Sequence, residues 1–159
     1  MRILIVSDTH RRNENFLRVV DKIGPLDLVV HCGDVEGSEY VISEAAGCPV
    51  EIVQGNNDFF SDLPKEKEFM IGGYKVWLTH GHHYYISMNN EMIKQEARAR
   101  EADIIMCGHT HKPAIDREAD LTLINPGSIS FPRQENRKPS YILMEIDAKG
   151  EAHYTLNYI

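Results

Sequence analysis

The chain has few cysteines and no long apolar run. Cys32, Cys48 and Cys107 are an odd number of thiols without a repeating spacing, which argues against a disulfide-rich secreted scaffold. No apolar run approaches the roughly 20 residues that a membrane-spanning helix needs. The sequence opens directly on a strand-like run and shows no signal peptide. We therefore expect a cytoplasmic protein with no membrane partner.

An excess of basic residues is also lacking. Lysine and arginine number 17 against 24 aspartates and glutamates, so the net charge is −7. Proteins that bind extended nucleic acid usually show a basic excess, which makes such a partner unexpected here. A small phosphorylated substrate stays compatible with this charge, because bound cations can supply the positive charge locally. A length of 159 residues with 42% hydrophobic residues predicts a single globular domain, residues 1–159.

Short apolar runs alternate with segments of helical periodicity in the first third of the chain. We predict strands at 2–6, 26–30, 50–53, 69–71, 74–78, 104–106, 121–124, 141–146 and 152–157. We predict helices that begin near Asn13, Ser38 and Asn89 or Asn90 and end near Gly24, Ala46 and Arg100. Residues 61–68 are expected to form a polar connection. The pattern indicates an α/β fold with parallel strands first and antiparallel strands later.

Six of these strands end in polar clusters, and ligands of open α/β sheets bind beyond the carboxyl ends of strands. Each cluster alone has an ordinary explanation as a turn, a helix cap or a surface side chain, but six together indicate a shared site. The candidate metal ligands are Asp8, His10, Asp34, Asn56, His80, His109 and His111. Carboxylate, imidazole and amide donors suit Mn, Fe, Co, Ni or Zn rather than Ca. Seven donors exceed the usual three for one catalytic metal, which indicates two metals.

These clusters resemble the motifs of the calcineurin-like metallophosphoesterases. Five motifs occur in the family's order and approximate spacing: Asp8-x-His10, Gly33-Asp34, Gly55-Asn56, His80-Gly81-His82 and Gly108-His109-x-His111. The short chain, the Asn-Pro-Gly-Ser segment 125–128 and Pro132-Arg133 resemble its small bacterial and archaeal phosphodiesterase branch, the YfcE-like proteins. The resemblance spans residues 1 to about 133. It implies an α/β fold of the metallophosphoesterase type, a β-sandwich of two mixed sheets flanked by helices.

The resemblance also implies two divalent metal ions, with Mn²⁺ expected first and Ni²⁺, Co²⁺, Zn²⁺ or Fe as alternatives. The first metal would be held by Asp8, His10 and His111. The second would be held by Asn56, His80 and His109. Asp34 would bridge both. The implied activity is a dinuclear metal-dependent phosphodiesterase, in which a metal-bridging hydroxide attacks phosphorus in line. No covalent phosphoenzyme is expected.

The sequence departs from the family at Asn57, where many members have a histidine that protonates the leaving group. An amide can donate a hydrogen bond but does not titrate, so it cannot be a general acid. The catalytic candidates are therefore Asp34, Asn57 and His82, and either His82 or His83 could supply the missing proton. Good leaving groups should react far better than poor ones.

Other functions remain open on the same fold. A eukaryotic retromer subunit resembles this fold and serves mainly as a protein-interaction platform, so a catalytically weak or inactive scaffold is one alternative. A phosphomonoesterase is another. The resemblance suggests a homodimer or homotetramer, with Phe59-Phe60 or Tyr84-Tyr85 as an apolar patch that could pair subunits. Asp58 is expected to orient a neighbour, and residues 125–128 are expected to brace the site. Candidate phosphate contacts are Arg11, Arg12 and Arg133.

Overall fold

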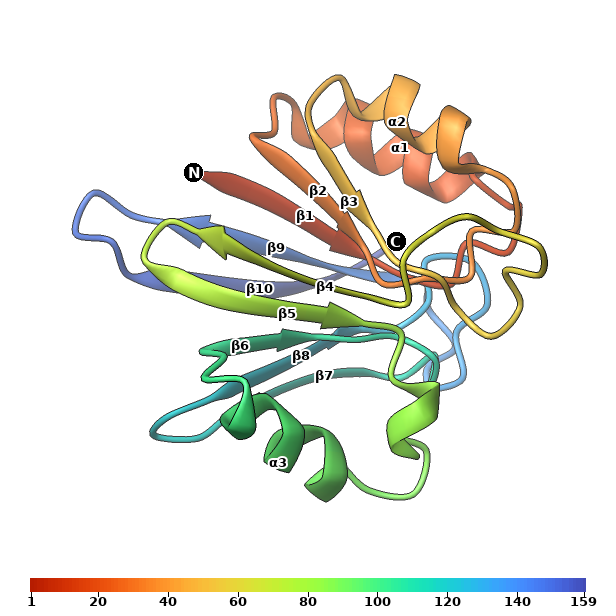
Figure 1. Cartoon of the computed structure of the whole chain (residues 1–159). Helices are drawn as coiled ribbons and strands as arrows, with labels where there is room; N and C mark the ends of the chain where they lie inside the picture. The colour runs from red at the N-terminus through yellow and green to blue at the C-terminus, as the bar shows by residue number, and fades with distance from the viewer.

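Two five-stranded mixed sheets pack face to face in the computed structural model, which describes all 159 residues (Figure 1). The first sheet has the order β10 (Ala152–Tyr158), β9 (Ser140–Ile146), β1 (Arg2–Val6), β2 (Leu28–His31) and β3 (Val50–Ile52). The second has the order β4 (Glu66–Ile71), β5 (Tyr74–Thr79), β6 (Ile104–Met106), β8 (Thr122–Pro126) and β7 (Pro113–Arg117). The predicted α/β sandwich of two mixed sheets flanked by helices is confirmed.

Strand residues alternate between two apolar layers because successive side chains of a strand point to opposite faces. On β1, Ile3 and Ile5 belong to the layer between the sheets, whereas Leu4 and Val6 face outward into a second apolar layer. Helices α1 (Glu14–Ile23) and α2 (Glu39–Ala46) supply the other side of that second layer.

The second sheet is covered on its outer face by α3 (Glu91–Ala99), which buries Ile93 and Ala97 against Trp77 of β5. A one-turn 3₁₀ helix, η1 (His82–Tyr84), leads from β5 toward α3. None of the helices combines the length and the apolar character needed to cross a membrane.

Each sheet contains three neighbouring parallel strands, and this arrangement creates the site. In the first sheet β1, β2 and β3 run parallel, and in the second β5, β6 and β8 do so. Figure 1 shows all six pointing toward one end of the sandwich, opposite the β9–β10 turn. The carboxyl ends of two parallel sets therefore meet at a single edge.

The structure corrects several sequence-based expectations. Parallel pairing is not confined to the first half of the chain, because α3 forms a crossover that returns β6 parallel to β5. Strand β4 begins at Glu66, inside the expected polar connection, because its residues pair along the whole of β5. Strand β7 was not predicted. Its residues are only partly buried, so they lack the apolar run that marks an interior strand. Asn13 and Ser38 precede their helices as expected, but neither side chain makes a capping hydrogen bond.

Candidate metal centre

The loops that follow the parallel strands bring all seven predicted ligands to one edge of the sandwich. Asp8 and His10 follow β1, Asp34 follows β2, and Asn56 follows β3. In the second sheet, His80 follows β5, and the loop after β6 carries the remaining two histidines, His109 and His111. The convergence that the strand-end pattern predicted is therefore present in the structure.

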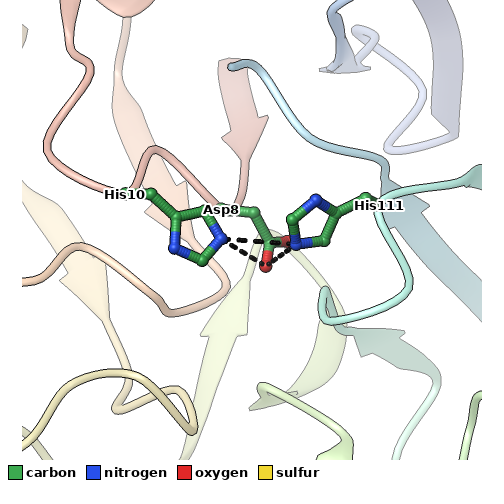
Figure 2. Close-up of side chains that lie close together, drawn as sticks. All are labelled: Asp8, His10 and His111. Atoms are coloured by element: carbon green, nitrogen blue, oxygen red, sulfur yellow. Dashed lines mark hydrogen bonds and ion pairs between the residues drawn. The ribbon is translucent and has the colours of Figure 1, made fainter. Parts of the chain in front are cut away.

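Asp8, His10 and His111 form the first donor group, and Figure 2 shows their polar ends pointing toward one another from the loop after β1 and the loop after β6. His111 Nε2 lies 3.1 Å from Asp8 Oδ1 and 3.3 Å from His10 Nε2. His10 Nε2 lies 3.8 Å from Asp8 Oδ1. These atoms are close enough to share one ion, and Asp8 is fully buried.

Asp34, His80, Asn56 and His109 form the second donor group. His80 Nε2 lies 3.4 Å from Asp34 Oδ2 and 3.0 Å from Asn56 Oδ1. The same amide oxygen lies 2.9 Å from His109 Nδ1. Asp34 also approaches the first group, because its Oδ2 lies 3.7 Å from His10 Nε2. A single carboxylate thus stands between two clusters of imidazoles.

Three of the imidazoles are held by acceptors on the nitrogen that faces away from the cluster. His10 Nδ1 lies 2.6 Å from Glu36 Oε1, His80 Nδ1 lies 2.7 Å from the Cys32 carbonyl, and His111 Nδ1 lies 2.6 Å from the Phe131 carbonyl. Because a carbonyl or carboxylate oxygen only accepts, we assign the ring proton to Nδ1 in each case. The Nε2 lone pairs then point into the cluster, as metal-binding histidines require.

Close backbone approaches explain the glycines of the motifs. A Cβ on Gly55 would lie 2.1 Å from Asp34 Oδ1, and one on Gly108 would lie 2.0 Å from Ser7 Oγ. Only glycine leaves room for these contacts. The site also holds residues in the left-handed region, including Asp8 at φ 55° and Asp34 at φ 59°. Such conformations are unfavourable for non-glycine residues and gather at functional sites, where surrounding contacts hold them.

Asp58 connects two loops of the site by hydrogen bonds, in keeping with the expectation that it orients a neighbour. Its buried carboxylate accepts backbone N–H bonds from Asp34 at 2.8 Å, Gly55 at 2.7 Å and Glu36 at 2.6 Å. The loop that carries Asp34 and the loop that carries Asn56 therefore share one anchor.

The Asn-Pro-Gly-Ser segment braces the site from the second sheet. Asn125 Nδ2 donates to the Gly108 carbonyl at 2.7 Å and to Thr110 Oγ1 at 3.1 Å. Ser128 Oγ donates to the Asp8 carbonyl at 2.8 Å. The segment thus connects the loops of both sheets, which agrees with the bracing role expected of residues 125–128.

Electrostatics inside the cluster keep its carboxylates ionised. Burial alone would raise the pKa of Asp8, yet the neighbouring His111 and His80 imidazoles leave it lowered. Burial likewise opposes ionisation of Asp34, while His80 and the Asn57 donors hold its pKa well below the usual range. Burial would lower the pKa of His80, and the nearby Asp34 and Asp8 carboxylates raise it instead. The site therefore attracts positive charge.

A cation fits the donor set that these residues form. The Nε2 lone pairs of His10 and His111 face each other and face Asp8 Oδ1, a buried oxygen without a hydrogen-bond partner. His80 Nε2 faces another acceptor, Asn56 Oδ1. Converging acceptors repel unless positive charge lies among them, and mixed carboxylate and imidazole donors suit divalent transition metals.

Two catalytic candidates of the sequence lie beside these groups. Asn57 donates its backbone N–H to Asp34 Oδ1 at 2.8 Å and its side-chain amide to Asp34 Oδ2 at 2.7 Å. His82 is half-buried, with its ring centroid 5.4 Å from that of His80. Burial and then the neighbouring imidazoles, His80 first, lower the pKa of His82 to about 4. His82 is therefore neutral at pH 7 and can donate a hydrogen bond from one nitrogen.

Sequence inspection did not single out Glu36, which accepts the bond from His10. The only signal was its place two residues beyond the Gly33-Asp34 motif. His31 precedes the Gly33-Asp34 motif and is fully buried. Its Nδ1 accepts the Gly33 N–H at 3.2 Å, so the Nε2 proton is directed to Thr9 Oγ1, also at 3.2 Å.

The sandwich with ionised carboxylates and imidazoles at its strand ends defines a protein of the metallophosphoesterase class. The chain belongs to the calcineurin-like phosphoesterase superfamily, whose domain model matches residues 1–149. It is 32% identical over 154 residues to a probable metallophosphoesterase of Methanothermobacter thermautotrophicus, covering 94% of this chain and 88% of the relative. It is 29% identical over 145 residues to a phosphodiesterase of Methanocaldococcus jannaschii, covering 80% of this chain and 83% of that protein.

Solved structures give the same fold. A predicted phosphoesterase of Streptococcus pneumoniae superimposes with a TM-score of 0.80 at 29% identity, over 99% of this chain and 97% of the other. A single mutant of Vps29 from Entamoeba histolytica superimposes with a TM-score of 0.81 at 25% identity, over 100% of this chain and 99% of the other.

Proposed function

We propose that the protein is a dinuclear metal-dependent phosphodiesterase that cleaves small phosphodiesters by in-line attack of hydroxide on phosphorus. The observation that carries the proposal is the pair of donor groups joined by Asp34. The carboxylate of Asp34 lies 3.4 Å from His80 Nε2 on one side and 3.7 Å from His10 Nε2 on the other. This placement supports a bridging carboxylate between two ions, with manganese as the first candidate.

The proposed ligands follow the two donor groups. Asp8, His10 and His111 would hold one ion, and Asn56, His80 and His109 the other. When bound, such ions lower the pKa of water and offset the charge on the phosphoryl oxygens. The protein keeps the ligands in place through the acceptors on their outward nitrogens.

Three residues then have separable tasks in the proposed mechanism. Asp34 would be a ligand shared by both ions, and Asn57 fixes its orientation through hydrogen bonds to both carboxylate oxygens. Neither residue can protonate a leaving group, since Asp34 is ionised and Asn57 does not titrate. His82 is a donor beside the second group, and as a neutral imidazole it is a weak acid. The proposal therefore favours substrates whose leaving group departs without protonation, such as aryl esters.

The test is hydrolysis of bis-p-nitrophenyl phosphate beside p-nitrophenyl phosphate, after chelation and separate addition of Mn²⁺, Ni²⁺, Co²⁺, Zn²⁺ or Mg²⁺. We expect metal-restored activity that is greater on the diester and is lost in Asp34→Asn. Asp62→Asn is the matched control, because the Asp62 side chain is exposed and makes no hydrogen bond or ion pair. Greater activity on the monoester would instead identify a phosphomonoesterase.

A second candidate is a protein-interaction scaffold with weak or no catalysis. The structural likeness to Vps29 favours it, as does Asn57 in place of a titratable group. Under this alternative, the protein would bind metal yet hydrolyse neither ester with any of the five cations.

A further inference from the structure

An open depression of about 860 Å³ adjoins the first donor group. His10 and His111 line it together with residues of the segment after β8, namely Ser130 to Arg133 and Arg137, which form its wall. The depression is therefore continuous with the group shown in Figure 2. A molecule whose phosphodiester reaches His10 and His111 would extend along this wall.

The two wall arginines have no close polar partner for their side chains. Neither guanidinium makes a hydrogen bond or an ion pair, although the chain has a net charge of −7. By contrast, Arg98 pairs with Glu118 and Asp120 on the face covered by α3. Arginines that stay unpaired in an acidic protein, beside a site for anions, indicate an anionic ligand.

Glu36 is the only carboxylate among the lining residues, and it is already engaged. Its Oε1 lies 2.6 Å from His10 Nδ1, and its Oε2 lies 4.0 Å from Arg11 Nε. Its charge is therefore directed toward His10 and Arg11. Arg12 places a further cation beside a lining residue, because its guanidinium lies 5.1 Å from the centroid of the Phe131 ring.

The wall segment is ordered by its own hydrogen bonds and by the site. The Arg133 N–H donates to the His111 carbonyl at 3.0 Å, and the Phe131 N–H donates to Ser128 Oγ at 2.7 Å. Arg137 adopts a left-handed φ of 51° and donates its N–H to the Gln134 carbonyl at 3.1 Å. The Arg133 backbone is thus bonded to a proposed metal ligand and the Arg137 backbone to its own segment, so both are held in place before an anion binds.

From this wall we infer that the substrate is a phosphodiester carrying a second phosphate, which Arg133 and Arg137 bind while the scissile group lies at the metal centre. Guanidinium groups match phosphate oxygens in paired hydrogen bonds. The inference rests on the proposed phosphodiesterase function and specifies its substrate class. A second phosphate gives Arg133 and Arg137 a binding partner, whereas a diester with a single negative charge at the metal centre would leave both arginines without one.

The test compares thymidine 5′-(p-nitrophenyl phosphate) with the same ester carrying a 3′-phosphate, since both release p-nitrophenol. We expect kcat/KM to be about tenfold higher for the 3′-phosphorylated ester at low salt, a modest gain because the arginines are exposed. The preference should shrink as ionic strength rises. In Arg133→Gln/Arg137→Gln the ratio of the two kcat/KM values should fall to about one. Lys149→Gln, which removes one positive charge from the β9–β10 turn, should leave the ratio as in the wild type.

Calorimetric affinities of the metal-loaded protein for the two products give an independent readout. Thymidine 3′,5′-bisphosphate should bind more tightly than thymidine 5′-monophosphate, and the double variant should abolish the difference. Equal values for the two esters and the two products, or a preference that survives in the double variant, would overturn the inference. If neither ester is hydrolysed, the proposed function fails, and the product affinities still decide whether the wall binds a second phosphate.

Discussion

Asp58→Asn is the substitution that most directly probes how the protein holds its site loops. Asp58 Oδ2 accepts the N–H groups of Asp34 and Gly55, while Oδ1 accepts that of Glu36. In the variant, the amide oxygen can replace only one of the two carboxylate oxygens as an acceptor. The NH₂ group takes the place of the other oxygen and must then face a backbone N–H. One unsatisfied buried donor costs about 1–3 kcal/mol, and the remaining bonds lose their charge assistance. We expect the metal-free variant to lose about 3 kcal/mol of unfolding free energy.

The same variant should bind metal less tightly, because ligand-orienting residues typically contribute 10- to 100-fold to affinity. Urea unfolding of chelated protein measures the first effect, and calorimetric metal titration measures the second. Asp62→Asn is the control for removing a nearby exposed charge. The reasoning is refuted if Asp58→Asn unfolds within about 0.5 kcal/mol of the wild type, the range of neutral surface changes.

Three further predictions concern single residues. In Gly55→Ala the new Cβ would meet Asp34 Oδ1 at 2.1 Å. Metal affinity, measured by titration, should therefore fall at least tenfold, while circular dichroism should show that the fold persists. Metal affinity equal to that of the wild type would contradict the steric account. Burial lowers the pKa of His31 to about 3, so the stability contributed by the neutral ring is present above pH 6.5 and is lost as the pH falls below that value. Relative to His31→Gln, the chelated wild type should lose about 2 kcal/mol of unfolding free energy between pH 7 and pH 5, measured with urea. Parallel pH profiles of the two proteins would disprove this. Asn57→His should restore a proton donor and raise the rate on alkyl diesters more than on aryl diesters, and an equal change across a leaving-group series would argue against a missing general acid.

The strand-end ligands were predictable because parallel strands must place their following residues at one edge. Asp8 and Asp34 follow β1 and β2, and His80 follows β5. Their positions directly after predicted strands were therefore enough to predict that they converge. The sandwich itself came from the family resemblance, since the expectation of late antiparallel strands missed the β5–β6 crossover. Strand β7 escaped prediction because its partly exposed residues carry no apolar period.

The supporting residues were harder to predict because their roles depend on loop conformation. Glu36 reaches His10 only through a backbone at φ 51°, which no local pattern specifies. Arg137 likewise reaches the wall of the depression from a left-handed position. Asp58 could be suspected from its place after the Gly55-Asn56 motif, but two of its three backbone donors, Asp34 and Glu36, come from a loop more than 20 residues away in the sequence.

The most direct measurement of the central claim is the number of divalent ions bound per chain. Chelated protein would be titrated with Mn²⁺ and checked by elemental analysis after removal of free metal. The account predicts two equivalents in the wild type and weakened binding of both in Asp34→Asn, because that carboxylate stands between the two donor groups. One equivalent or none in the wild type, or two unchanged affinities in Asp34→Asn, would contradict a dinuclear centre bridged by Asp34.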